Sequence, residues 1–162
     1  MPISKEEVSA FLKLDLPEEL TRTEEKKLKK EIGEYLLVSI LDYVGEGKSP
    51  IAGQGNFKKL SKTYANEEKS GDRLPNLDLF GDMLDSLKFK DAGDGIEFGI
   101  YNKKQAIKAY AHNTGFEGHP VLESPSLKRQ FIPDKGQKLR RDITQGIEQI
   151  IEGFLDARKE NS

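Results

Sequence analysis

The 162-residue sequence contains no cysteine. Disulfides, thiol nucleophiles and thiolate metal sites are therefore excluded together, and the composition fits a reducing compartment. No apolar run approaches the roughly 20 residues that a membrane-spanning helix needs. Nothing at the amino terminus resembles a signal peptide, because Lys5, Glu6 and Lys13 interrupt the first 16 residues. We therefore expect a soluble protein with no membrane partner.

A strong charge of one sign is missing as well. The 26 Lys and Arg residues nearly balance the 28 Asp and Glu residues, which gives a formal net charge of -2. This balance calls for neither a nucleic-acid partner nor an acidic membrane. The length is that of one ordinary domain, and we expect residues 1–162 to form a single domain.

Two capping boxes predict helices in the first part of the chain. Ser4 and Glu7 form the first, which opens a short helix that ends before Pro17. Thr21 opens the second, and apolar residues then recur at spacings of three and four. This pattern is typical of a long amphipathic helix with one core face, and Gly45 is placed to end it.

An exposed loop is predicted over residues 45–56, where the composition shifts to Gly, Ser, Pro and Gln. Phe57, Leu60 and Tyr64 then recur at helical spacing among lysines, which predicts a second helix that Gly71 closes. The three apolar residues would form the buried face of this helix. Its lysines would then lie on the solvent side, so recognition of single-stranded nucleic acid by this helix is the less favoured interpretation.

The period changes from helical to alternating after a turn at residues 77–81. Apolar residues alternate with lysines over residues 87–90, and with Glu97 and Gly99 over residues 96–100. An Asp-Gly dipeptide lies between the two runs, at residues 94–95. This combination predicts a β-hairpin.

Three further elements complete the expected chain. Residues 103–113 form a short helical pattern that ends at Asn113 or Gly115. Residues 129–132 predict a third strand. Asp134 is placed to cap a final helix, whose apolar residues keep helical spacing to the end of the chain.

These elements predict an α+β fold. The strands cluster between helices, with no regular β-α-β alternation, so we expect a small antiparallel sheet packed against long amphipathic helices. Residues 1–70 would form a helical amino-terminal part, and residues 71–162 would form the sheet and the carboxy-terminal helix.

The two histidines raise the question of a metal or acid/base site. His112 and His119 flank a glycine-rich break that also holds Glu117. A catalytic zinc site typically has three protein ligands, often with a histidine pair at helical spacing, which neither histidine has. Nearby, Ser124 and Ser126 stand in no nucleophile-elbow pattern. A small metal-dependent hydrolase is therefore kept only as an alternative.

Other motifs also lack what their chemistry requires. The "GQG" at residues 53–55 has neither the lysine nor the Ser/Thr of a phosphate-binding loop. The "DAGDG" at residues 91–95 lacks the ligand pattern of a calcium loop, and a hairpin turn explains it. We identify no catalytic, cofactor-binding or metal-binding residues and expect no cofactor.

The second half of the chain carries an ordered series of short motifs. The series begins with "GDMLDSL", continues with Phe98-Gly99 and "YAHNTG", and ends with "RQFIP" before the final helix. In this order the motifs resemble the Mu G-like phage virion morphogenesis proteins and the related HK97-type tail components. The resemblance covers residues 74 to 158 and depends on the order of the motifs, because each is weak alone.

This resemblance implies a structural virion protein of a tailed bacteriophage, not an enzyme. Such a protein would be a tail-completion or head-tail joining (neck) component, assembled in the host cytoplasm and located in the virion. It would form a homo-oligomeric ring, commonly a hexamer, around the DNA channel. Its partners would be the phage connector or adaptor and the tail tube or tail terminator proteins, and DNA would pass the lumen without specific binding.

The resemblance also implies architectural or interface roles for the residues that match its motifs. These residues are Gly81, Leu84, Tyr110, His112, Gly115, Arg129, Phe131 and Pro133. His112 would then be a structural residue of a helix-to-loop corner, with Arg129 to Phe131 pairing beside it as a strand. The loop over residues 45–56 would order when it docks on a neighbour. A cellular binding module of the toxin-antitoxin type is the second alternative.

Overall fold

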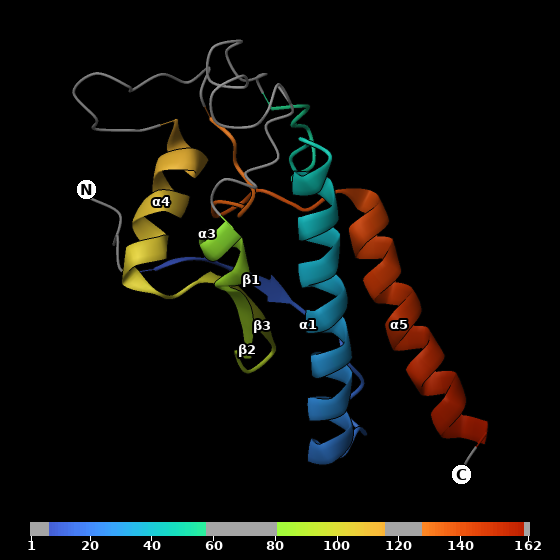
Figure 1. Ribbon diagram of the computed structural model, residues 1–162. Coiled ribbons are helices and arrows are strands. Elements are labelled where there is room, and N and C mark those ends of the chain that lie inside the picture. The colour runs from blue at the N-terminus through green and yellow to red at the C-terminus, as the bar shows by residue number, and fades with distance from the viewer. Residues whose placement is uncertain (1–6, 58–80, 116–127, 161–162) are drawn as a thin grey trace.

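The computed structural model describes residues 7–57, 81–115 and 128–160 (Figure 1). These residues form a three-stranded antiparallel sheet and four helices, which confirms the predicted α+β class. The elements are β1 (Val8–Lys13), α1 (Arg22–Gly45), α3 (Gly81–Asp85), β2 (Leu87–Asp91), β3 (Gly95–Ile100), α4 (Lys103–Thr114) and α5 (Arg141–Glu160). The helix predicted after Phe57 lies outside the described residues.

The predicted hairpin is confirmed as β2 and β3. The two strands pair antiparallel, with Leu87 opposite Ile100 and Asp91 opposite Ile96. The turn differs in one detail from the Asp-Gly pattern, because the glycine with the left-handed conformation is Gly93, at φ 79°. A residue without a side chain adopts this conformation at little cost.

The first predicted helix is wrong where the structure describes it, because residues 8–13 form the strand β1. This strand pairs antiparallel with β3, so the sheet order is β1-β3-β2. Val8, Ala10 and Leu12 pack against the core, and residues of the other parity point away from it. This alternation, together with an open edge of β3, outweighs the helix-start pattern that precedes it.

Two glycines of β3 let β1 approach closely. A Cβ atom on Gly95 would overlap the carbonyl oxygen of Leu12, and one on Gly99 would overlap that of Val8. A side chain at either position would force the two strands apart. Glycine at positions 95 and 99 therefore allows the backbones of β1 and β3 to pair.

The long helix α1 begins as predicted. The Thr21 hydroxyl accepts a hydrogen bond from the Glu24 N–H (3.1 Å), and the Glu24 carboxylate accepts one from the Thr21 N–H (2.9 Å). The capping residue at the other end is Glu46 rather than Gly45, followed by the left-handed Gly47. One face of α1 is fully buried, and its members are Leu28, Ile32, Leu36, Ile40 and Val44.

Helix α1 is fixed to the hairpin by a buried lysine. The Lys29 side chain is only 5% exposed, and its ammonium contacts the carboxylates of Asp91 (2.8 Å) and Glu25 (2.9 Å). It also donates to the Gly93 carbonyl in the hairpin turn. Burial opposes the charged form of Lys29, but these hydrogen bonds outweigh it and raise the pKa of the lysine.

Helices α1 and α5 lie side by side and antiparallel (Figure 1). Arg158 near the end of α5 contacts Glu24 at the start of α1 (Nε to Oε2, 2.7 Å). At the opposite ends, the Tyr43 hydroxyl donates to the Asp142 carboxylate (2.7 Å). Helix α5 starts at Arg141, later than the predicted cap at Asp134.

The delayed start of α5 has a clear cause. Ile51 and Leu139 form an antiparallel bridge, in which the Ala52 N–H donates to the Lys138 carbonyl (2.8 Å) and the Arg140 N–H to the Pro50 carbonyl (2.9 Å). The backbone of residues 138–140 is therefore extended and paired, and it cannot join the helix.

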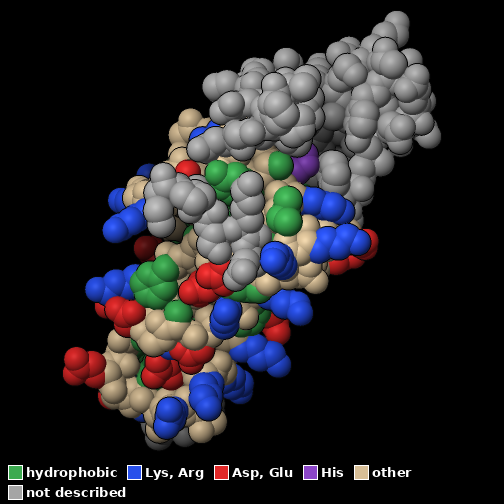
Figure 2. Space-filling model, turned by 90° about the vertical axis from the view of Figure 1, so that its left-hand side faces the viewer, with side chains coloured by type: hydrophobic (Ala, Val, Ile, Leu, Met, Phe, Trp, Pro, Cys, Tyr) green, Lys and Arg blue, Asp and Glu red, His purple; other side chains and the backbone are tan. Residues whose placement is uncertain are grey.

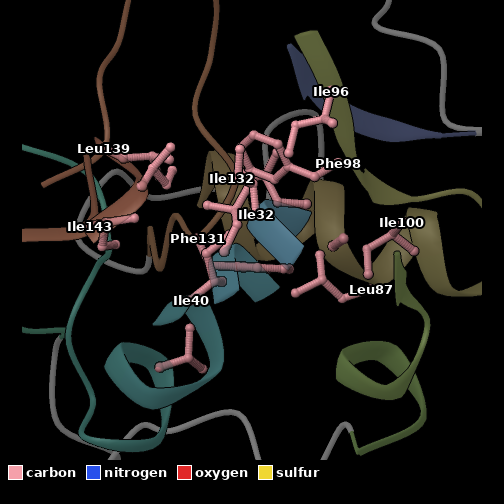
Figure 3. Packing of buried hydrophobic residues seen from close by; sticks show 14 of the residues in the cluster. Ile32, Ile40, Leu87, Ile96, Phe98, Ile100, Phe131, Ile132, Leu139 and Ile143 are labelled. Carbon is pink, nitrogen blue, oxygen red and sulfur yellow. The ribbon is translucent and has the colours of Figure 1, made fainter. Parts of the chain in front are cut away.

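The predicted strand at residues 129–132 is also wrong, because this segment is irregular and joins no sheet. Its apolar residues are nevertheless central to the core: Phe131 is fully buried and Ile132 is 1% exposed. Figure 3 shows both side chains among those of Ile32 from α1 and Phe98 from β3. The apolar residues of this segment correctly predicted that it is buried. They did not distinguish a strand from a buried irregular segment.

Candidate functional site

Helix α4 ends in a buried corner. Its amino terminus is capped by Asn102, whose side chain accepts from the Gln105 N–H (3.2 Å). Its carboxy terminus is capped by Gly115 in the left-handed conformation (φ 70°), and the Gly115 N–H donates to the Ala111 carbonyl. Of the two predicted helix ends, Gly115 is therefore the cap. His112 and Asn113, in the last turn, are 3% and 5% exposed.

The irregular segment before α5 binds this corner. The Arg129 N–H donates to the His112 carbonyl (2.7 Å), which satisfies a carbonyl at the helix end. The Asn113 side chain then accepts from the Phe131 N–H (3.0 Å) and donates to the Ile132 carbonyl (3.2 Å). The Asn113 side chain thus makes hydrogen bonds to Phe131 and Ile132 that a neighbouring strand would otherwise make. Residues 129–132 therefore pack here without joining the sheet.

The electrostatics of His112 fit a structural residue. Burial is the main factor that lowers its pKa, and the positive charge of Arg129 lowers it further, to about 4. The imidazole is therefore neutral at pH 7. A neutral imidazole in a residue that is only 3% exposed has little access to a substrate or to bulk water, so it is badly placed for acid/base catalysis.

The structure brings most of the predicted residues to this corner. Arg129 is 9% exposed, and Pro133 is buried directly after the segment that binds Asn113. Tyr110 is half-buried, one turn before Gly115 on α4. Leu84 is half-buried on α3, which starts at Gly81 and packs against α4.

The rest of the histidine hypothesis lies outside the described residues. Glu117, His119, Ser124 and Ser126 all fall between residues 116 and 127. Within residues 7–57, 81–115 and 128–160, no three His, Cys, Asp or Glu side chains come close enough to hold a metal ion. None of the helices described there has the length and apolar character to cross a bilayer.

A polar network that the sequence did not predict holds the loop after α1. The Arg140 guanidinium donates to the carbonyls of Ser49 (2.7 Å) and Gln54 (2.8 Å). The Ser49 hydroxyl donates to the Gln130 carbonyl (2.8 Å), and the Gln130 side chain also bonds those of Gln54 and Gln137. We call this group the polar clamp.

The polar clamp buries the middle of the loop, so the prediction of an exposed loop over residues 45–56 is wrong for residues 49–51 and correct at both ends and at the tip. Ser49 and Ile51 are each 1% exposed, and Pro50 is buried between them. The loop packs on residues 130 and 137–140 of its own chain, so it does not depend on a partner for its order. The exposed residues of the loop are 45, 46, 52, 53, 55 and 56, and its tip includes Ala52 and Gly53. Composition alone missed this because the partners lie more than 70 residues away in sequence.

No protein-family model, curated protein or solved structure matches this chain. The described residues form an α+β scaffold with a tightly bonded corner at the end of α4. The face seen in Figure 2 carries basic and acidic side chains interspersed, with hydrophobic ones in small patches.

Proposed function

We propose that this protein is a structural component of a tailed-bacteriophage virion, acting in tail completion or head-tail joining at the neck. One observation carries the proposal. From residue 81 onward, the structure contains a short helix, a hairpin, a helix ending in "YAHNTG", a buried "RQFIP" segment and a final helix, in that order. This order of helices and hairpin agrees with the one that the motif resemblance implies, except that residues 129–131 form no strand.

The chemistry of the corner supports a role in assembly. His112, Arg129 and Phe131 hold the end of α4 against the segment before α5, and all three are buried. Residues that are enclosed in this way fix the relative position of elements. Function would then depend on the surfaces that these elements present to neighbouring subunits.

Those surfaces would form a ring by a head-to-tail contact that closes by rotation, most simply a hexamer. Connector or adaptor proteins would lie on one side of the ring, and tail tube or tail terminator proteins on the other. DNA must slide through such a ring, so tight phosphate binding would hinder function. The near-neutral net charge and the mixed charges of Figure 2 agree with this requirement.

The test is the mass of the purified protein, alone and after mixing with tail tubes or connector-bearing heads, by light scattering and negative-stain imaging. A ring seen on the particle, or in solution, supports the proposal. A chain that ignores both particles and forms no ring contradicts it.

A matched pair of variants makes the test specific for the exposed loop tip. Ala52→Glu changes an exposed residue and should leave the fold intact, whereas Phe131→Ala removes a fully buried ring and should destabilise it. If the loop tip docks on a neighbour, Ala52→Glu reduces assembly with no loss of thermal stability.

Metal analysis of protein purified without chelator tests the alternative function, since a stoichiometric transition metal would favour the small metal-dependent hydrolase.

A further inference from the structure

A groove runs along the outer edge of β1. Its volume is about 1110 Å³, and every residue from Glu7 to Lys13 lines it. A groove on one face of the sheet would meet only alternate residues of a strand, because successive side chains point to opposite faces. This groove therefore follows the edge of β1, and the segment from Ile132 to Leu139 forms its opposite wall.

The hydrogen-bonding groups of this edge follow from the strand register. The Leu14 N–H donates to the Asp94 carbonyl (3.0 Å), so Leu12 and Ala10, which have the same parity, also bond to β3. The N–H and C=O groups of Ser9, Phe11 and Lys13 must then point away from β3. None of these groups has a hydrogen-bond partner among the described residues.

The other edge of the sheet is less open to a further strand. Strand β2 carries Lys88 and Lys90, both exposed, and lysines on an edge strand discourage pairing. The middle of β1 carries no such charge, and the exposed residue there is Phe11, at 52%. The β1 edge is therefore the one that is free to accept a strand.

The walls of the groove indicate the side chains that such a strand would carry. Its accessible apolar lining comes from the half-buried Val8, Ala10 and Leu12 and from the exposed Phe11. Phe98, Ile132 and Leu139 also line the groove, but each is at most 6% exposed. Its exposed charged residues are mainly basic, although the chain as a whole has a net charge of -2. The basic residues are Lys13, Lys135, Lys138 and Arg141, against Glu7 and Asp134.

We propose that the β1 groove binds an extended segment of a partner protein by strand addition, with apolar side chains toward the walls and acidic ones toward the basic residues. Unpaired backbone groups recognise an extended chain, and alternate side chains then select its sequence. This inference goes beyond the proposed function and stands on the groove alone, because it makes no use of ring formation.

The first test uses a fluorescein-labelled nine-residue peptide of alternating glutamate and valine, with the full-length chain, in a fluorescence-anisotropy titration. The critical variant is Phe11→Pro, which removes an outward N–H and keeps the bonds to β3. Phe11→Ala is its matched control, because it removes the side chain but keeps the N–H. We expect Phe11→Pro to weaken binding by about tenfold or more, and Phe11→Ala to remain within about threefold of the wild type.

The second test changes charge at exposed positions where folding is not at risk. The double variant Lys135→Glu/Lys138→Glu should weaken binding of the glutamate-valine peptide and favour one that alternates lysine and valine. A wild-type chain that binds neither peptide, or binds both equally, overturns the proposal. Equal binding by Phe11→Pro and Phe11→Ala, with both folded by circular dichroism, also overturns it.

A second copy of the chain is the competing occupant, and light scattering separates it from a partner protein. Self-association that is lost in Phe11→Pro and retained in Phe11→Ala, in a chain that binds no peptide, would assign the edge to a copy and overturn the partner assignment. Peptide binding by a chain that assembles no ring would leave this inference intact while the proposed function fails.

Discussion

The ring of Phe89 in β2 lies directly on the backbone of Gly33 in α1. A Cβ atom at position 33 would overlap the Cγ, Cδ2 and Cε2 atoms of that ring. Gly33 is buried in the middle of a 24-residue helix, where glycine is otherwise unfavourable. The close contact between helix and sheet explains why glycine occupies this position.

Gly33→Ala is predicted to destabilise the protein. The gain in helix propensity is about 1 kcal/mol, but the added methyl group must displace a ring packed against the core, at a cost of about 1 to 3 kcal/mol or more. Chemical denaturation should show a lower midpoint. The cost should shrink in a Phe89→Ala background, because the clash is then removed.

Gly153→Ala is the matched control for this prediction. Gly153 also lies within a helix, α5, but it is exposed and a Cβ atom there would meet nothing within 4 Å. The substitution should therefore raise the unfolding free energy by up to about 1 kcal/mol. Equal effects of the two substitutions would show that the contact with Phe89 has no energetic importance.

Gly99→Ala is predicted to loosen β1 from the sheet. The new Cβ atom would overlap backbone atoms of Val8 and Ser9, which cannot rotate away as a side chain can. Hydrogen exchange should become faster at the amides of Val8, Ala10 and Leu12, which bond to β3. Gly55→Ala, which meets nothing within 4 Å, should leave these amides unchanged.

The sequence predicted elements whose signals are local. The Thr21 capping box, the alternation in β2 and β3, and the glycine that ends α4 each depend on residues a few positions apart. The order of motifs indicates His112 and Arg129 as architectural or interface candidates, and that role stays a prediction. Their buried positions and their mutual hydrogen bond appear only in the structure.

Long-range pairing explains the errors. Residues 8–13 form a strand because β3, more than 80 residues later, offers an edge with glycines where β1 must approach. Residues 129–132 form no strand because partners other than a strand satisfy their backbone groups, namely His112, Asn113 and Ser49. The residues within either segment do not indicate these distant partners. Local sequence patterns therefore predicted the wrong secondary structure for both segments.

Arg140→Ala is predicted to break the polar clamp. The substitution leaves the carbonyls of Ser49 and Gln54 without their charged donor, at a cost of about 1 to 3 kcal/mol. Arg140→Lys should rescue little, because one ammonium cannot reproduce two directed bonds. Arg141→Ala, at an exposed neighbouring position, is the control and should change stability little. Thermal denaturation of the three variants checks the prediction, and equal midpoints for Arg140→Ala and Arg141→Ala would contradict it.

His112 is predicted to make stability depend on pH between about 6.5 and 4. Its pKa is about 4 in the folded chain, against 6.5 for an unperturbed histidine. In this interval the unfolded state binds the extra proton, so the unfolding free energy rises with pH and falls on acidification. The loss from pH 7 to pH 4 amounts to about 3 kcal/mol and is complete near the folded pKa.

Chemical denaturation at pH 7, 6, 5 and 4 isolates this contribution when the wild type is compared with His112→Gln. The variant has no imidazole at this position, so its stability should fall less steeply over the same interval. His119→Gln is the control for the other histidine and should keep the steep dependence. Parallel curves for the wild type and His112→Gln would mean that the imidazole ionises as easily in the folded chain as in the unfolded one. In that case the corner would not be closed to water, and a chemical role for His112 would have to be reconsidered.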